Sequence, residues 1–169
     1  MGAASDVILS GGSAGGLAVL YNIDHLATLL TGSPRLVGFP DAGFFLDQPN
    51  ALAGGSHTYR QAFVGADPVW NVTGGGGTNA ACVAAQPTGE AWRCLMAEYL
   101  VQHVRTPLFV MNSAYDAYQL GNIGGSSCVP TAATPCDDAV ALSYGAAVRR
   151  AAAAVAADAK NGVYVTACY

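Results

Sequence analysis

The chain has 169 residues, of which 52% are hydrophobic and 11% are charged, and its net charge is −4. Charged residues make up about a quarter of a typical soluble domain, so this composition argues against intrinsic disorder. Seven basic side chains against 11 acidic ones leave no basic patch for nucleic acid, and no run of 18 apolar residues is present to span a membrane.

The first third of the sequence predicts a strand, a helix and a second strand. Residues 7–10 form an apolar run closed by glycines, as in a buried parallel strand. Residues 14–30 place apolar side chains at helical spacing, and residues 31–34 contain the Gly and Pro that end the helix. Residues 36–39 are expected to form the second strand.

The rest of the chain continues this alternation. We expect residues 48–89 to be mostly loop, a helix over 90–103 and a third buried strand over 107–111. A helix capped by Asp137 or Asp138 is expected to run to Lys160, before a last strand over 163–167. Strands that alternate with helices predict an α/β fold with a mostly parallel sheet and flanking helices.

Both ends of the chain are unusual. Residues 1–6 lack the basic and apolar regions of a secretory signal. A strand is expected within a few residues of Met1, and the C-terminus falls in the middle of another strand. Because intact domains usually end in polar, frayed residues, we expect a single domain over residues 1–169 that is incomplete at both ends.

Five cysteines point to an oxidising compartment. Cys82 with Cys94, and Cys128 with Cys136, form two close pairs in loop-like sequence, which predicts disulfides. Zinc is the alternative, although there is no Cys-x-x-Cys spacing or nearby His to favour it. Cys168 is left over, which suggests a partner outside the chain.

A glycosylation sequon agrees with secretion. Asn71 begins the sequence Asn-Val-Thr, although such sequons also occur by chance.

The sequence Gly-Gly-Ser-Ala-Gly at residues 11–15 fits the Gly-x-Ser-x-Gly pattern between a strand and a helix. This context predicts the nucleophile elbow of an α/β-hydrolase, with Ser13 as nucleophile and the Ala14 N–H as an oxyanion donor. The small residues Gly12, Ala14 and Gly15 agree with this prediction, because larger neighbours of Ser13 are expected to clash at so sharp a turn. A phosphate-binding loop fits less well, since it needs Gly at position 13 or a Gly-Lys-Ser/Thr sequence. A glycine turn without function remains an alternative.

Asp116 follows a predicted strand, where ligands bind in open α/β sheets, so it is the candidate triad acid. Its alternative is an exposed turn aspartate. No histidine follows it in the chain. His25 lies twelve residues after Ser13 on one helix, roughly 18 Å away, and cannot be its base. His57 and His103 are expected to be a surface loop residue and a helix C-terminal cation.

These motifs resemble the pectin acetylesterases of plants and microbes together with the animal Notum carboxylesterases. Residues 9–30 resemble the family's elbow and following helix, and residues 37–47 resemble its Asp-Ala/Ser-Gly-Phe/Trp-Phe-Leu-Asp string. Residues 106–120 resemble the strand that carries the acid, which assigns that role to Asp116. Residues 160–169 resemble the strand that leads to the catalytic His.

The resemblance also implies what lies outside the chain. In the family a Cys, an aromatic residue or Leu, one further residue and then His follow in order, and Cys168 and Tyr169 match the first two. The base would therefore lie two residues beyond Tyr169. The Gly-Gly-x-Trp-Cys segment with further oxyanion donors, the first strands and a signal peptide would precede Met1. Cys82 and Cys94 match loop cysteines of the family, whereas residues 48–89 otherwise match poorly.

The implied reaction is ester hydrolysis by a secreted serine carboxylesterase that needs no metal or cofactor. Residues 114–119 resemble the pectin acetylesterases more than Notum, which favours acetyl groups on a cell-wall polysaccharide over a fatty acyl group on a protein. The competing hypothesis is a truncated, non-catalytic α/β module. Without the base, we expect these 169 residues alone to be nearly inactive and poorly stable.

Overall fold

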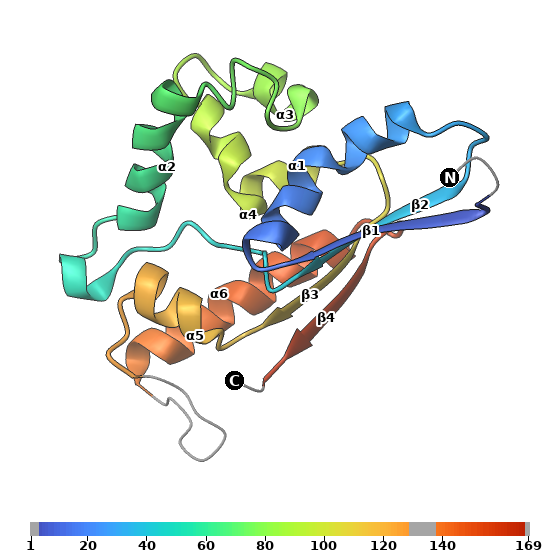
Figure 1. The fold of residues 1–169 in the computed structure, drawn as a ribbon. Helices are drawn as coiled ribbons and strands as arrows, with labels where there is room; N and C mark the ends of the chain where they lie inside the picture. Colours follow the sequence, from blue (N-terminus) through green and yellow to red (C-terminus); the bar gives the residue numbers. More distant parts are fainter. Residues whose placement is uncertain (1–3, 129–137, 168–169) are drawn as a thin grey trace.

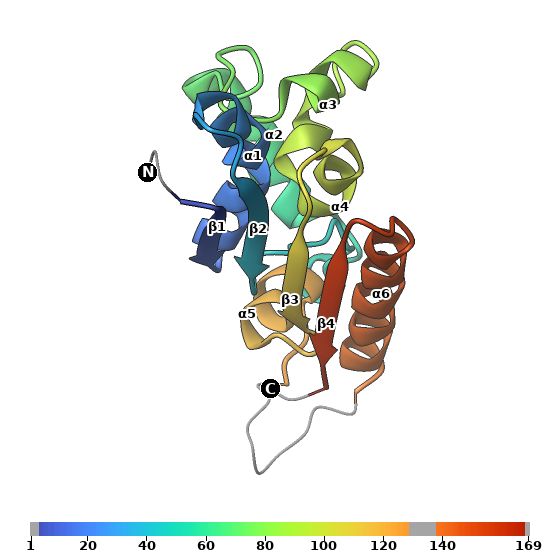
Figure 2. The ribbon, with the colours of Figure 1, turned by 90° about the vertical axis from the view of Figure 1, so that its right-hand side faces the viewer.

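The predicted strands form one parallel sheet. The computed structural model describes residues 4–128 and 138–167. Its four strands are β1 (Asp6–Gly12), β2 (Arg35–Asp41), β3 (Phe109–Ser113) and β4 (Gly162–Thr166), and they lie side by side in chain order (Figures 1 and 2). All three pairings are parallel, so the expected α/β fold with a parallel sheet is confirmed.

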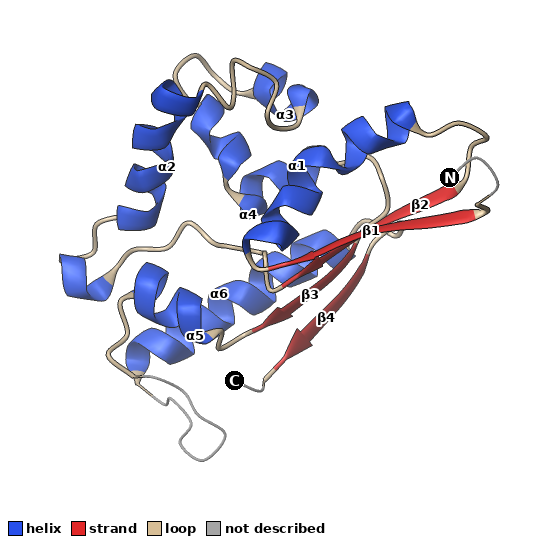
Figure 3. Ribbon diagram, viewed as in Figure 1, coloured by secondary structure: helices blue, strands red, loops and turns tan. Residues whose placement is uncertain are grey.

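Two long helices pack on one face of this sheet. Helix α1 (Ala14–Leu29) packs against β1 and β2, and helix α6 (Ala139–Ala156) packs against β4 (Figure 3). Successive side chains of a strand point to opposite faces of the sheet, and those that point to these helices join them in one hydrophobic core. The opposite face leaves apolar side chains uncovered, and Ile8, for example, is 69% exposed.

The region expected to be mostly loop contains two helices, so that expectation was wrong. Helix α2 (Thr58–Trp70) and helix α3 (Ala80–Ala85) both lie within residues 48–89. No residue of α2 is buried, and the helix includes Gly65 and Pro68. Tyr59 and Phe63 pack against the core while only partly buried, so the helix lacks the continuous buried stripe and the uninterrupted helix formers that reveal a helix in sequence.

The helix expected over residues 90–103 is broken into three pieces. A 3₁₀ turn (Ala91–Leu95), the single-turn α4 (Ala97–Leu100) and a second 3₁₀ turn (Val101–His103) follow one another. The Cys94 and Leu95 carbonyls accept hydrogen bonds from the hydroxyls of Thr78, at 2.8 Å, and Tyr21, at 2.7 Å. Contacts with other elements thus replace part of the helical hydrogen-bond ladder.

Smaller differences concern element ends and caps. Asp138 caps α6 by accepting from the Ala141 N–H at 2.7 Å, and the helix ends at Ala156 rather than Lys160. Asp137, the other predicted cap, lies outside the described residues. A three-residue helix, α5 (Ala117–Gln119), follows β3.

The cysteine prediction is confirmed for one pair. Cys82 and Cys94 form a disulfide that joins α3 to the segment before α4. Cys128 is also disulfide-bonded, whereas Cys136 and Cys168 lie outside the described part of the chain. Among the described helices none is long and apolar enough to cross a bilayer.

Candidate active site

Ser13 occupies a strained turn between β1 and α1. It follows the last residue of β1, caps α1 and has φ 54° and ψ −123°. A positive φ is uncommon for a residue other than glycine, and such backbone strain concentrates at functional sites. The Ser13 side chain is exposed. The predicted strand–turn–helix geometry of the elbow is therefore present.

Backbone contacts hold this turn from both sides. The Ser13 N–H donates to the Asp41 carbonyl at 2.8 Å, while its own carbonyl accepts from the Gly16 and Leu17 N–H groups at 2.9 and 3.2 Å. Ala14 is the first residue of α1, and the first N–H groups of a helix have no intrahelical acceptor. Its predicted role as an oxyanion donor is compatible with this position.

The glycines that the turn requires differ in part from those expected. A Cβ at Gly11 would lie 2.4 Å from the Gly15 carbonyl oxygen, and one at Gly16 would lie 2.8 Å from the Asp41 carbonyl oxygen. By contrast, a Cβ at Gly12 or Gly15 would meet nothing within 4 Å apart from adjacent residues and the backbone of its own helix. The steric argument for small residues at positions 12 and 15 was wrong, because the close backbone approaches fall on their neighbours.

Asp116 lies at the same edge of the sheet as Ser13. It comes just after β3, is half-buried, and caps α5 by accepting from the Gln119 N–H at 2.8 Å. Gly12 pairs with Asp41, which in turn pairs with Met111, so only β2 separates the ends of β1 and β3. Two strand spacings correspond to about 10 Å, a gap that a third catalytic side chain could bridge.

The end of β4 lies beside the segment that carries Asp116. The Ala114 N–H donates to the Thr166 carbonyl at 2.9 Å, two residues before Asp116. Because β4 is parallel to β3, β4 ends at the edge of the sheet where Ser13 and Asp116 lie.

A buried polar pair lies next to Asp116. Gln119 is fully buried, and its side-chain carbonyl accepts from the Tyr144 hydroxyl at 2.8 Å. The Gln119 amide nitrogen has no hydrogen-bond partner among the described residues. Burial, together with the nearby charge of Asp116, raises the pKa of Tyr144 well above its ordinary value, so this hydroxyl stays neutral.

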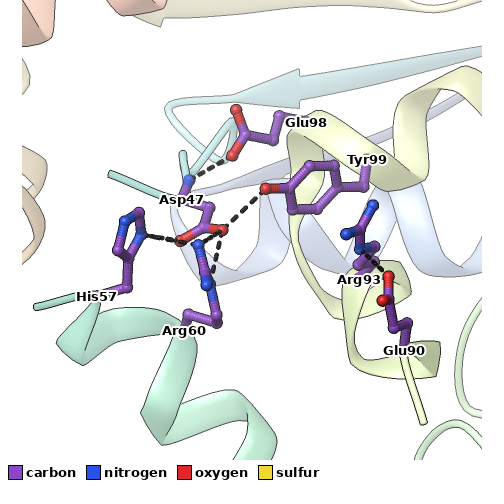
Figure 4. Close-up of polar contacts among 7 residues, drawn as sticks. All are labelled: Asp47, His57, Arg60, Glu90, Arg93, Glu98 and Tyr99. Atoms are coloured by element: carbon purple, nitrogen blue, oxygen red, sulfur yellow. Dashed lines mark hydrogen bonds and ion pairs between the residues drawn. The ribbon is translucent and has the colours of Figure 1, made fainter. Parts of the chain in front are cut away.

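A second polar site was not predicted from the sequence. We term it the Asp47 cluster: Asp47, His57, Arg60, Glu98 and Tyr99 (Figure 4). The Asp47 side chain is 0% exposed. One carboxylate oxygen accepts from His57 Nδ1 at 2.6 Å. The other accepts from Arg60 at 2.6 and 2.8 Å and from the Tyr99 hydroxyl at 2.8 Å.

Glu98 completes the cluster by accepting from the Asp47 N–H at 2.6 Å. The two carboxyl groups titrate in opposite directions. Burial alone would raise the pKa of Asp47, but hydrogen bonds from Arg60, His57 and Tyr99 outweigh it and lower that pKa. Burial raises the pKa of Glu98, against the opposing hydrogen bond from the Asp47 N–H. Asp47 is thus the member of the pair that the fold stabilises as an anion.

The three histidines lie at different sites. His57 lies in the loop just before α2, as expected, but its ring is half-buried against Asp47 instead of standing free at the surface. His103 ends a 3₁₀ turn, in agreement with its predicted place at the end of a helix. His25 is exposed on α1. No hydrogen bond joins a histidine to the Ser13 side chain within the described ranges.

A pocket of about 530 Å³ lies away from the elbow. It is lined by Asp24 and His25 of α1, by Asn79 just before α3 and by Arg105 before β3, and neither Ser13 nor Asp116 lines it. In the described part of the chain, no three His, Cys, Asp or Glu side chains gather where they could hold a metal ion.

Comparisons with known proteins decide the family. A family model described as Pectinacetylesterase matches residues 1–169. The chain belongs to the pectin acetylesterase family. It is 33% identical over 136 residues to pectin acetylesterase 5 of Arabidopsis thaliana, covering 80% of this chain and 29% of that protein. It is also 33% identical over 126 residues to palmitoleoyl-protein carboxylesterase notum2 of Xenopus laevis, covering 69% of this chain and 25% of that protein.

A solved structure supports the same family fold. The chain is similar to the Wnt deacylase Notum from Drosophila, with a TM-score of 0.75 and 26% identity over 96% of this chain and 45% of the Notum chain. The pectin acetylesterase-like chain thus spans less than a third of the two sequence relatives above and under half of the Notum structure.

Proposed function

We propose that the complete protein is a serine carboxylesterase that removes acetyl groups from pectin or a related cell-wall polysaccharide. The observation that carries this proposal is the Ser13 elbow, where a non-glycine residue with φ 54° joins a parallel strand to a helix. A plain glycine turn would not require a strained, exposed serine at its tip. Membership of the pectin acetylesterase family supports the same chemistry.

In the proposed reaction Ser13 Oγ attacks the acetyl carbonyl carbon, and a histidine takes the hydroxyl proton. The resulting oxyanion receives hydrogen bonds from the Ala14 N–H and from the segment that the family resemblance assigns upstream of Met1. The sugar oxygen then leaves with the proton from the histidine. Water repeats the sequence on the acetyl-enzyme and releases acetate, which restores Ser13.

Asp116 would orient that histidine and stabilise its charged form. The family resemblance assigns the histidine to a position two residues beyond Tyr169. The hydrogen bond from Ala114 to Thr166 supports this assignment, because it places the end of β4 next to the segment that carries Asp116. A side chain shortly after β4 would therefore approach the edge between Asp116 and Ser13.

We propose a secreted enzyme of the extracellular space or cell wall. The Cys82–Cys94 disulfide favours an oxidising compartment. Asn71, the predicted glycosylation site, is exposed at the C-terminal end of α2 and is accessible for modification.

A second candidate function is removal of a fatty acyl group from a protein. The relatives named palmitoleoyl-protein carboxylesterase and Wnt deacylase favour it. The similarity of residues 114–119 to pectin acetylesterases favours the polysaccharide. A non-catalytic module is the third possibility.

The test is to express the full-length gene product and measure acetate release from acetylated pectin, with a palmitoleoylated serine peptide in parallel. We expect hydrolysis of the pectin, and a loss of at least about a thousandfold in Ser13→Ala. Preference for the peptide would indicate the protein deacylase. Activity that survives Ser13→Ala would overturn the triad, and inactivity on both substrates would favour the non-catalytic module.

A further inference from the structure

We infer that Asp47 is a positioning residue for the nucleophile: the Asp47 cluster anchors the segment 41–47, and that segment holds the strained Ser13 turn. This inference rests on the proposed function of Ser13. It assigns a catalytic consequence to a buried network that touches neither Ser13 nor Asp116 through any of the hydrogen bonds described above.

The anchor is a carboxylate completely removed from solvent. His57, the residue before α2, and Arg60, within α2, both donate to it. Tyr99 of α4 is the third side-chain donor. The Asp47 backbone is fixed as well, through its N–H and Glu98. Charge-assisted hydrogen bonds are about twice as strong as neutral ones, so these contacts fix the position of Asp47 firmly.

The segment between β2 and Asp47 has no helix or strand of its own, yet residues 43–47 are all buried. Its position depends on individual contacts with neighbouring elements. The Ala42 N–H donates to the Met111 carbonyl at 2.9 Å, and the Phe44 N–H donates to the Asn112 side chain at 3.3 Å. These bonds attach the segment to β3, the strand that leads to Asp116.

The same segment touches the Ser13 turn at two points. The Asp41 carbonyl accepts the Ser13 N–H. Two residues later, Gly43 lies so close to the first turn of α1 that a Cβ there would be 2.5 Å from the Leu17 nitrogen and a Gly16 carbon. Any shift of residues 41–43 would therefore move the backbone that holds Ser13.

A strained backbone persists only where its surroundings over-determine it. If the anchor at Asp47 is weakened, the segment can relax away from α1, and Ser13 can relax from its positive φ. The hydroxyl would then be misplaced relative to the acetyl carbonyl and the base. Misplacement by about 1 Å can cost a hundredfold in rate, without loss of the substrate-binding surface.

The test uses Asp47→Asn in the full-length protein, with Glu90→Gln as a matched control. Glu90 forms an ion pair with Arg93 at 2.8 Å near the cluster, but both side chains are about 40% exposed and Glu90 makes no bond to residues 41–47 (Figure 4). Both variants exchange a carboxylate for an amide. Titration with a fluorophosphonate gives the concentration of reactive Ser13. The turnover rate of p-nitrophenyl acetate is then divided by that concentration.

We expect kcat of Asp47→Asn to fall about 10- to 100-fold with KM within about twofold, and the rate of Ser13 phosphonylation to fall with it. Glu90→Gln should match the wild type. A purely structural role would reduce the number of reactive sites but leave kcat per site unchanged, and that result would overturn the inference. If the wild type shows no Ser13-dependent hydrolysis, the proposed function fails instead.

Tyr99→Phe covers the case in which Asp47→Asn does not fold. This change removes one neutral donor and keeps the ring and the ion pairs of Asp47. We expect a smaller fall in kcat per site, about threefold, again at unchanged KM. An unchanged kcat in a folded Tyr99→Phe variant would contradict the inference.

Discussion

The edge of the sheet where Ser13 and Asp116 lie and the Asp47 cluster are built in opposite ways. Ser13 is exposed and strained, and Asp116 is half-buried with a backbone N–H as its partner. Asp47 is fully buried and bonded through both carboxylate oxygens. A group that must meet a substrate cannot be saturated with protein contacts. Its position has to be fixed by contacts of the neighbouring backbone, and we infer that residues 41–47 supply these contacts for Ser13.

The largest expected effect concerns the contact between these two regions. Gly43→Ala would place a Cβ 2.5 Å from the backbone of α1, where no flexible side chain can move aside. We expect the free energy of unfolding of the full-length protein to fall by about 3 kcal/mol in urea titrations, together with loss of esterase activity. The comparison variant is Gly15→Ala, where a Cβ meets nothing within 4 Å and Ala favours the helix. A stable Gly43→Ala protein would show that the segment does not press on the elbow.

A second prediction compares two arginines that both lie over the Trp92 ring, Arg60 at 5.1 Å and Arg93 at 5.7 Å. Arg60→Met leaves a buried carboxylate without its main charge partner. We expect a loss of about 2 kcal/mol, less than for a fully buried pair because a third of the Arg60 side chain is exposed. Arg93→Met breaks an exposed pair, and a loss below about 0.5 kcal/mol is expected. Equal losses in chemical denaturation would mean that stacking on Trp92, rather than Asp47, explains the effect of Arg60.

The two regions also differ in how far sequence could predict them. The Ser13 elbow has a five-residue pattern between a strand and a helix, so its place in the chain could be predicted locally, whereas the contacts of Asp41 and Gly43 that hold it could not. Asp116 followed from the same alternation of strands and helices. These predictions concern local geometry and the parallel sheet that it produces.

The Asp47 cluster was not predicted because the partners of Asp47 come from helices that the sequence did not predict correctly. His57 immediately precedes α2 and Arg60 lies in its first turn, and this helix packs only the partly buried Tyr59 and Phe63 against the core. Tyr99 lies in a single-turn helix, within a segment expected to be one continuous helix. The usable signal was Asp47 itself, a carboxylate at the end of the apolar run Phe-Phe-Leu in a chain with few charged residues. A buried acid needs donors, and sequence alone did not indicate where they come from.

A third prediction follows from the lowered pKa of Asp47. Above a pH of about 5 its carboxyl is ionised in both the native and the unfolded protein, so its contribution to stability is fully present. At lower pH the unfolded chain binds a proton that the native Asp47 does not yet take up, and this contribution is lost as pH falls through the native pKa. The wild type should therefore lose stability more steeply in acid than Asp47→Asn, as measured by thermal unfolding from pH 5 to pH 2. Parallel curves would show that the cluster does not hold Asp47 as an anion.

The smallest effect is expected from the other carboxyl group of the cluster. Because burial raises the pKa of Glu98, its ionised form is less favourable in the native protein than in the unfolded one. Its contribution therefore lowers stability as pH rises through the native pKa, the opposite sign to Asp47. Glu98→Gln retains an oxygen that can accept the Asp47 N–H, so we expect unchanged or slightly higher stability at pH 7, by up to about 1 kcal/mol. Urea titrations of Glu98→Gln and Asp47→Asn should thus diverge at pH 7. A marked loss in Glu98→Gln would show that the Glu98 charge supports Arg60 and His57 instead of opposing Asp47.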